Sequence, residues 1–180
     1  MVLHYPPLSI NIRELIPDHI VTHICRYDAI DINKTYIQYP YHQMNKPKGL
    51  WYSYGHYWLD FLQRIDPHAS KYDISWKYSS LFKLDIDLTK ILRISTKIAF
   101  EYFVEEYSYL DSEQVRLIAW EKVSETYDGV DFYNYFDLKS QIKGTCEYSW
   151  FDSLDFPSGC IWNLDAIKYI EKLTGEFILI

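Results

Sequence analysis

Short stretches in which apolar and polar side chains alternate recur along the chain and predict β-strands. The clearest is SLFKLDIDL at 80–88, where every second side chain from Phe82 onward is apolar. HIVTHICRY at 19–27 alternates in the same way and is rich in β-branched residues, which favour strands. Further strands are predicted at 50–53, 90–96, 128–135, 158–163 and 176–180, with a turn at the start of 128–135.

Two segments instead repeat their apolar residues every three or four positions, which is the spacing of one face of a helix. The segment 56–65 is predicted to be an amphipathic helix that Pro67 ends, because proline cannot continue a helix. The segment 96–107 is a second predicted helix, with the hydroxyl of Thr96 as its N-terminal cap.

Two further helices are predicted at 112–127, with Ser112 as the cap, and at 164–173, which would close the chain. The stretch 29–37 is predicted to form a short helical turn followed by an extended piece. Strands outnumber helices, and the helices interrupt the strands irregularly. This order predicts an α+β fold, a compact and mostly antiparallel split sheet with flanking helices.

The length of 180 residues predicts one domain, with 1–19 as an irregular lead-in and 20–180 as the core. No basic region followed by an apolar run stands at the start, and no apolar stretch is long enough for a membrane span. We therefore expect no signal peptide, no membrane partner and a cytoplasmic location, in its own cell or in a host.

Charge, composition and the lack of known motifs argue against several classes of function. The net charge of −7 disfavours a protein that coats duplex DNA, because such binding depends on neutralising phosphates. A local basic patch remains open at Lys46 and Lys48, which would otherwise be a solvated loop. Three cysteines form no C-x-x-C pair and the histidines have no ligand spacing, so no metal site is predicted. The signatures of P-loop proteins, dinucleotide-binding folds, zinc proteases and α/β-hydrolases are missing as well.

Four short pieces occur in an order that is informative: THIC at 22–25, KGLWYS at 48–53, YDGVDF at 127–132 and GCIWNLDAIKYI at 159–170. In this order the chain resembles the ADP-ribosyltransferase superfamily, which has the fold of diphtheria toxin, the poly-ADP-ribose polymerases and the tRNA 2′-phosphotransferases. The resemblance covers roughly residues 20 to 170. It implies that NAD is bound as a substrate, that its nicotinamide bond is cleaved, and that ADP-ribose passes to an unknown protein or nucleic-acid acceptor. It also fits a bacterial or phage effector or toxin.

The resemblance implies a cofactor site on the first two strands and the helix that follows. His23 would hydrogen-bond the ribose of NAD, Gly49 would let the backbone approach the ligand, and Ser53 would bond the nicotinamide ribose. The aromatic run supplies rings that can stack on the cationic nicotinamide. The complete predicted set is Thr22, His23, Gly49, Trp51, Tyr52, Ser53, Tyr57 and Trp58. Trp51 and Tyr52 are neighbours in a strand, so one is expected to enter the core and the other to line the cleft.

The catalytic acid is the point at which the sequence departs from the family. Cleaving the bond to nicotinamide builds positive charge on the sugar, so a nearby carboxylate lowers the barrier. The late strand SGCIWN has no glutamate, and the candidates are Asp155 first, then Asp152 and Glu147. Two alternatives stay open. One is a catalytically silent binding module that recognises a partner protein or an NAD-derived nucleotide. The other is phosphotransferase-type chemistry on RNA.

Overall fold

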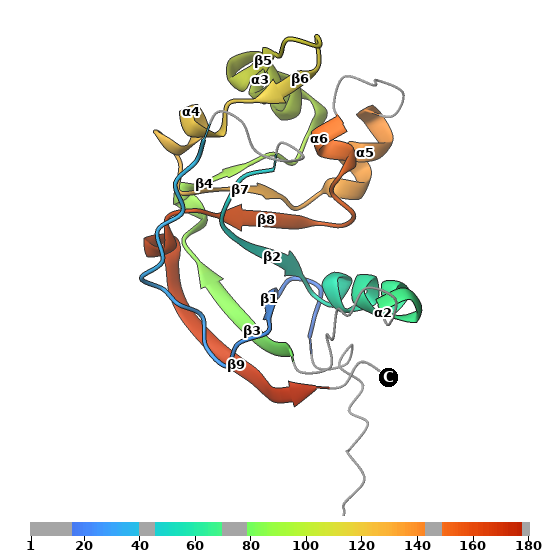
Figure 1. Cartoon of the computed structure of the whole chain (residues 1–180), viewed down its shortest axis with the longest axis vertical. Helices are drawn as coiled ribbons and strands as arrows, with labels where there is room; N and C mark the ends of the chain where they lie inside the picture. The colour runs from blue at the N-terminus through green and yellow to red at the C-terminus, as the bar shows by residue number, and fades with distance from the viewer. Residues whose placement is uncertain (1–15, 40–45, 70–78, 143–148, 178–180) are drawn as a thin grey trace, which may run out of the picture.

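A computed structural model describes residues 16–39, 46–69, 79–142 and 149–177, and Figure 1 shows the fold. Within these ranges the strands form one seven-stranded sheet in the order β4–β7–β8–β2–β1–β3–β9. Neighbouring strands are antiparallel except β4 and β7, which are parallel. The strands are β1 (Val21–Cys25), β2 (Leu50–Tyr54), β3 (Ser79–Ile86), β4 (Ile91–Arg93), β7 (Gly129–Phe132), β8 (Ser158–Ile161) and β9 (Ile167–Phe177).

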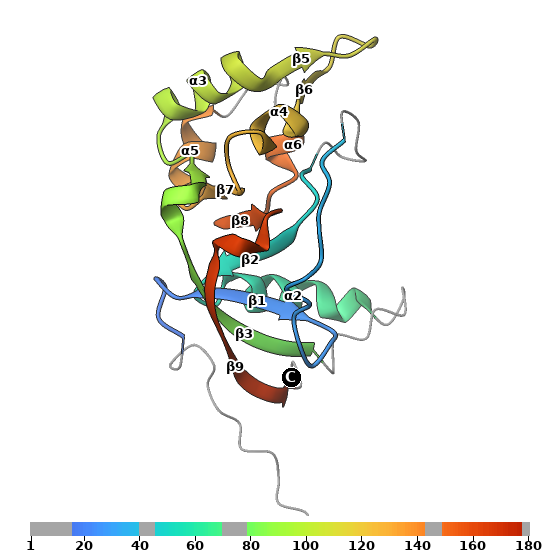
Figure 2. The ribbon, with the colours of Figure 1, turned by 90° about the vertical axis from the view of Figure 1, so that its left-hand side faces the viewer.

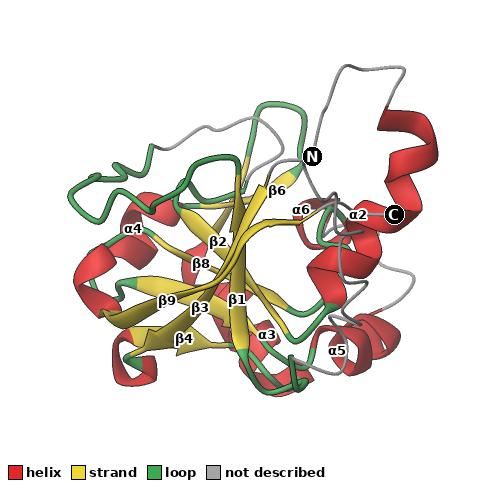
Figure 3. Ribbon diagram, turned by 90° about the horizontal axis from the view of Figure 1, so that it is seen from below, coloured by secondary structure: helices red, strands yellow, loops and turns green. Residues whose placement is uncertain are grey.

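The helices lie beside this sheet (Figure 3), and a separate two-stranded ribbon is formed by β5 (Ser108–Leu110) and β6 (Arg116–Ile118). The helices are α2 (Tyr57–Ala69), α3 (Lys97–Tyr107), α4 (Trp120–Ser124), α5 (Tyr135–Ile142) and α6 (Ser149–Asp152), with short 3₁₀ turns at Leu88–Lys90 and Leu164–Ala166. Figures 1 and 2 both place α3 to α6 beyond β7 and β8, at the end of the sheet opposite β3 and β9. The α+β class and the mostly antiparallel sheet are thus confirmed, but the main sheet is continuous where a split sheet was predicted.

The core falls into two parts on either side of the sheet. On one face, α3 to α6 pack on β7 and β8 around Phe100, Trp120 and Trp150, and α2 packs Leu59 and Leu62 on β1 and β3. The other face has its own buried cluster, built from β2, β3 and the turn after β8. Residues that alternate along a strand therefore enter different clusters, and this alternation decides which side chains of β2 meet which pocket.

The prediction of a helix at 112–127 is wrong. The segment instead completes the β5–β6 hairpin and then forms the short α4. The carboxylate of Asp111 accepts hydrogen bonds from the backbone of Glu113 and Val115, and Gln114 adopts a positive φ of 63°. Aspartate favours such a turn because its short side chain bonds the backbone just ahead of it. The turn begins before Ser112, so the predicted cap lies inside a hairpin.

The prediction of a closing helix at 164–173 is also wrong, because most of it belongs to β9. The pairing with β3 places Ile167 opposite Ile86 and Ile170 opposite Leu84, and the register skips Lys168. A second shift skips Leu173. Each bulge inserts one residue, so two isoleucines three positions apart share a face, which in a regular strand they would not. A helical spacing in the sequence is here produced by a bulged strand.

Other elements differ in detail. Helix α3 starts as predicted, since the hydroxyl of Thr96 accepts a hydrogen bond from the backbone of Ala99. Helix α2 continues through Pro67 to Ala69, so the predicted end is wrong. The stretch 29–37 contains a turn but neither the helix nor a strand, and α5 and α6 were not predicted. The predicted terminal strand at 176–180 is the end of β9 as far as Phe177, and 178–180 lies outside the described residues.

Candidate functional site

The motif KGLWYS folds into β2 and the residues just before it, and its side chains separate as predicted. Tyr52 is fully buried, whereas Trp51 is half-buried and faces the opposite side of the strand. The ring of Tyr52 lies on Gly159 of the neighbouring strand, where an added Cβ would stand 2.2 Å from the ring. Tyr52 is therefore a core residue, and Trp51 is the one that lines a surface groove.

This groove, which we call the basic groove, has a volume of about 510 Å³. It is lined by Lys34, Thr35, Tyr36, Ile37, Tyr39, Pro47, Lys48, Gly49 and Trp51. None of these residues is acidic. The volume falls within the ~300–1,000 Å³ typical of sites for small organic ligands and cofactors.

The lysines of the basic groove lie over aromatic rings. The Nζ atom of Lys34 is 4.9 Å from the ring centre of Tyr36, and that of Lys48 is 4.4 Å from the ring centre of Tyr39. Lys46, from the same turn as Lys48, lies 5.8 Å from the ring of Trp51. Cation–π attraction of about 0.5–1 kcal/mol per exposed pair restrains such side chains without neutralising them. The groove thus presents positive charge beside flat apolar surface.

One buried amide joins the two chain segments that form the groove. The side chain of Gln38 donates to the carbonyl of Lys48 at 2.6 Å and accepts from the backbone N–H of Lys48 at 2.9 Å. Gln38 is only 8% exposed, so these bonds are shielded from water. The Gln38 amide thus bonds both backbone groups of Lys48, as a neighbouring strand would, and fixes the segment before Tyr39 against the residues that lead into β2.

Gly49 lines the groove, but its lack of a side chain serves the fold. A Cβ at this position would stand 2.4 Å from the carbonyl oxygen of Ile161 and 2.5 Å from the sulfur of Cys160. The close approach is therefore to β8. Burial raises the pKa of the Cys160 thiol well above its usual value, which agrees with a core cysteine.

His23 occupies the place where the pairing between β1 and β2 stops. The recorded register joins Val21 to Tyr54 and Thr22 to Ser53, and His23 Nδ1 then donates to the carbonyl of Trp51 at 2.6 Å. Its ring meets Trp58 edge-on at 5.8 Å. Burial lowers the pKa of His23, although the bond to Trp51 opposes this, so the ring is neutral at neutral pH with Nε2 left as an acceptor.

The hydroxyl groups of Thr22 and Ser53, which were predicted to lie in the cofactor site, instead form hydrogen bonds inside the fold. Thr22 is buried and its Oγ1 donates to the carbonyl of Gly55 at 3.2 Å. Ser53 is fully buried and its Oγ donates to the carbonyl of Pro157 at 3.2 Å. These bonds connect β1, β2 and β8, and neither residue lines the groove.

The acidic candidates lie in the turn that precedes β8. Asp155 and Asp152 are both exposed, and Glu147 lies outside the described residues. Lys46 donates to the carbonyl of Ser153 at 2.6 Å. Burial lowers the pKa of Lys46, and the negative charge of Asp155 partly offsets that effect. Asp155 is therefore close enough to act electrostatically on a lysine that touches Trp51.

Pairwise contacts thus link His23 to the Trp51 carbonyl and to the Trp58 ring, and Lys46 links the Trp51 ring to Ser153. Of the predicted site residues that the structure describes, Gly49 and Trp51 are the ones that line the basic groove. Comparisons with protein-family models, curated proteins and solved structures found no match to this chain. The interpretation of the site consequently rests on its own residues. Within the described part of the chain there is no cluster of three or more His, Cys, Asp or Glu side chains placed to hold a metal, and no helix long and apolar enough to cross a membrane.

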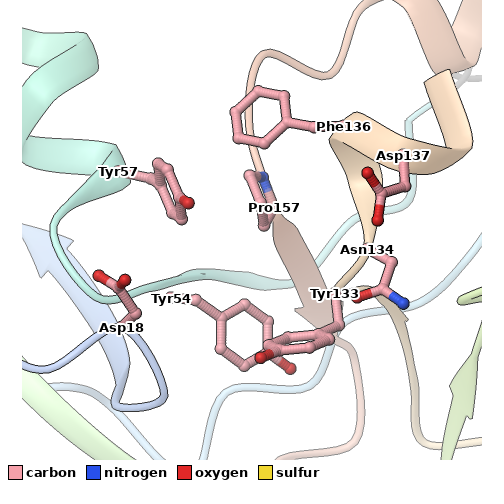
Figure 4. A pocket seen from close by; sticks show the side chains of 8 residues that line it. All are labelled: Asp18, Tyr54, Tyr57, Tyr133, Asn134, Phe136, Asp137 and Pro157. Carbon is pink, nitrogen blue, oxygen red and sulfur yellow. The ribbon is translucent and has the colours of Figure 1, made fainter. Parts of the chain in front are cut away.

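Sequence reasoning missed half of the basic groove and an entire second pocket. Lys34, Tyr36 and Gln38 alternate in NKTYIQY at 33–39, a pattern of basic and aromatic residues that could have been noticed. Tyr57, predicted to stack on nicotinamide, does not line the basic groove. It lines a separate pocket at the other end of β2 (Figure 4).

Proposed function

We propose that the basic groove binds NAD and that the chain is an ADP-ribosyltransferase, which cleaves the nicotinamide–ribose bond and passes ADP-ribose to a protein or nucleic-acid acceptor. The observation that carries this proposal is that Gly49 and Trp51, chosen from the sequence motif, line one groove with Lys34 and Lys48. A dinucleotide needs positive charge for its two phosphates and flat surface for its rings, and this groove offers both.

The lysines are suited to the pyrophosphate. They come from two segments that Gln38 holds together, so a phosphate between Lys34 and Lys48 would meet charges from both sides. Ammonium groups act as point charges and need no fixed angle to a phosphate oxygen. The rings of Tyr36, Tyr39 and Trp51 remain as apolar contacts for the bases.

The chemical step requires a carboxylate close to the sugar. NAD and an acceptor whose nucleophilic atom carries a hydrogen would give the ADP-ribosylated acceptor, free nicotinamide and a proton. As the bond to nicotinamide lengthens, its electron pair leaves with the ring and the sugar becomes positive. Asp155 is the acid we assign to stabilise that charge, because its field reaches Lys46 beside Trp51. The acceptor atom would lose its proton as it attacks the sugar carbon.

His23 is assigned a positioning role. Its Nδ1–H holds the carbonyl of Trp51, which fixes the start of β2 and the tilt of the Trp51 side chain. Replacing His23 by glutamine keeps a side-chain donor and should retain NAD affinity, whereas alanine should lower it.

A direct test measures nicotinamide release and NAD affinity together. We expect the wild-type chain to release nicotinamide, Trp51→Ala and Lys48→Ala to lower NAD affinity about tenfold, and Asp155→Asn to lower the rate with little change in affinity. Asp152→Asn, three residues away and also exposed, is the matched control and should retain most of the rate. Absence of both NAD binding and nicotinamide release from the folded wild-type chain would refute the proposal.

A catalytically silent binding module is the second candidate, and one observation favours it. The late strand β8 carries no acidic residue, and Asp155 is exposed and does not line the groove. A silent module would be stabilised by NAD, by about 2.7 kcal/mol at a hundred times the dissociation constant, without releasing nicotinamide. Asp155→Asn would then have no effect in either assay.

A further inference from the structure

The second pocket lies where β2 ends and α2 and α5 begin, and we call it the tyrosine pocket. It has a volume of about 240 Å³ and is lined by Asp18, Tyr54, Tyr57, Tyr133, Asn134, Phe136, Asp137 and Pro157. Figure 4 shows four aromatic side chains around a central space, with the carboxylates of Asp18 and Asp137 on opposite sides of it. We propose that this pocket binds an alkylated ammonium group, such as a trimethylammonium head.

The rings form two edge-to-face pairs. Tyr54 and Tyr133 lie with ring centres 4.8 Å apart, and Tyr57 and Phe136 with ring centres 5.5 Å apart. Each pair joins different elements: Tyr54 of β2 meets Tyr133 of the turn before α5, and Tyr57 of α2 meets Phe136 of α5. Aromatic side chains arranged around a space recognise quaternary ammonium groups, because the negative faces of the rings attract a cation that is weakly hydrated.

The charges of the pocket favour the same ligand. Asp18 and Asp137 are acidic, and among the described residues that line the pocket none is basic. Two basic side chains nearby have acidic partners already: Arg93 Nε donates to Asp131 at 3.0 Å, and His56 Nδ1 lies 3.5 Å from Asp18. The pocket therefore keeps a negative balance, mainly through Asp137, which would repel an anion and attract a cation.

A buried carboxyl group holds one wall in place. Asp131 is fully buried, and its Oδ2 accepts from the Tyr54 hydroxyl at 2.8 Å as well as from Arg93. The guanidinium of Arg93 in turn lies 5.6 Å from the ring of Tyr133. The phenol of Tyr54 is thus anchored at its far end, so its ring can present a face or edge to a ligand without loss of rotamer freedom on binding.

Size and geometry argue for an ammonium head in particular. At about 240 Å³ the tyrosine pocket is smaller than the ~300–1,000 Å³ of sites for drug-sized ligands, and it fits a head group better than a dinucleotide. A guanidinium prefers a carboxylate that accepts two parallel hydrogen bonds. Such a pair would engage only one of Asp18 and Asp137, which stand on opposite sides of the space, whereas a rounded ammonium head between them would face both.

The first test uses the wild-type chain and two matched ligands. Choline and its uncharged isostere, in which carbon replaces the ammonium nitrogen, have the same shape. We expect choline to bind at least about tenfold more tightly by NMR titration, with shifts of the Tyr57 and Phe136 ring signals, because only the cation gains from the rings and carboxylates. Equal affinity for the two ligands, or tighter binding of methylguanidinium than of tetramethylammonium, overturns the proposal.

The second test uses variants and locates the site. Phe136→Ala and Asp137→Asn should each weaken choline binding about threefold to tenfold. Tyr102→Ala removes an exposed aromatic residue of α3, far from the lining residues in sequence, and should leave choline affinity unchanged. Unchanged affinity in a folded Asp137→Asn variant, checked by its melting temperature, contradicts the assignment. If Phe136→Ala fails to fold, the ligand pair on the wild-type chain still decides.

Discussion

The two ends of β2 carry aromatic residues in similar number but with opposite charge beside them. At the start of the strand, Trp51 shares the basic groove with Lys34 and Lys48. At its end, Tyr54 shares the tyrosine pocket with Asp18 and Asp137. Aromatic rings accept either kind of ligand, stacking on bases or attracting cations through their faces. The neighbouring charges therefore decide which ligand each end can take.

The two ends also differ in how they are held. The basic groove is joined by hydrogen bonds of the Gln38 amide to the backbone of Lys48, and of its lining lysines Lys34 is exposed and Lys48 is half-buried. The tyrosine pocket is backed by the buried Asp131 and its bonds to Tyr54 and Arg93. We therefore expect variants near the pocket to change the stability of the fold more than variants in the groove.

The largest expected effect is that of Gly159→Ala, which overpacks the core around Tyr52, whose ring meets the pocket residue Tyr54 edge-on at 5.9 Å. The new Cβ would stand 2.2 Å from the Tyr52 ring and 2.7 Å from the carbonyl oxygen of Val130, so ring or backbone must move. Overpacking a core costs about 1–3 kcal/mol, and the contact with a backbone carbonyl places this substitution toward the upper end of that range. The measurement is chemical denaturation, and a loss below about 1 kcal/mol would show that Tyr52 is free to move aside.

The next effect concerns Asp131 and pH. Burial raises the pKa of Asp131 above its usual value, opposed by the bonds from Tyr54 and Arg93. The folded chain then binds this proton more tightly than the unfolded chain. Its contribution to stability is present below the ordinary carboxyl pKa and is lost as pH rises through the higher folded value.

Asp131→Asn removes that titration while keeping an oxygen acceptor for Tyr54. Over this pH window the free energy of unfolding of the variant, minus that of the wild type, should increase with pH. Denaturation curves at several pH values measure this difference. Asp165→Asn, at an exposed position, is the control and should show no such trend. If this difference stays constant or falls with pH, burial does not raise the pKa of Asp131.

A smaller effect separates the ligand preferences of the two ends. Lys34→Ala should weaken binding of ADP-ribose by up to about fivefold and leave choline binding unchanged, because one solvated charge contributes about 1 kcal/mol or less. Asp137→Asn should do the reverse. Isothermal titration of both ligands against both variants tests the comparison, and parallel losses in both variants would show that the two ends form one site.

The smallest effect on stability is expected for an ion pair that lies in neither the basic groove nor the tyrosine pocket. Lys83 and Glu171 form a 3.3 Å ion pair between β3 and β9, with both side chains close to half exposed. Solvent screening leaves such a pair worth about 0.2–1 kcal/mol, so Lys83→Ala should change the free energy of unfolding by no more than that. A larger loss by urea denaturation would mean that the β3–β9 pairing depends on this contact.

The elements that were predicted correctly are those whose spacing of apolar residues fits only one kind of secondary structure. Regular alternation gave β1 and β3, and a threonine followed by a helical spacing gave α3. The errors came where a tertiary contact or a side chain selects between two patterns. Asp111 turns a helical spacing into a hairpin, and pairing with β3 turns another into the bulged β9.

The site was predictable only in part for a similar reason. Strand alternation correctly separated Trp51 from Tyr52, since that follows from the backbone alone. Which partners meet Trp51 depends on the path of 26–39, which has no regular structure and which the Gln38 amide joins to the residues just before β2. Contacts between segments far apart in the sequence cannot be predicted from the local spacing of residues. The tyrosine pocket is another example, because it combines residues as far apart as Asp18 and Pro157.

The bulges of β9 have a consequence for how the molecule behaves in a crowded solution. Among the described strands, β9 is one of the two at the edges of the sheet, and a long regular edge would offer its free N–H and C=O groups to a strand of another molecule. The skipped residues at Lys168 and Leu173 break the even spacing of those groups, and Lys168 and Lys172 add charge near the edge. The same irregularity that hid the strand in the sequence therefore guards the fold against edge-to-edge aggregation.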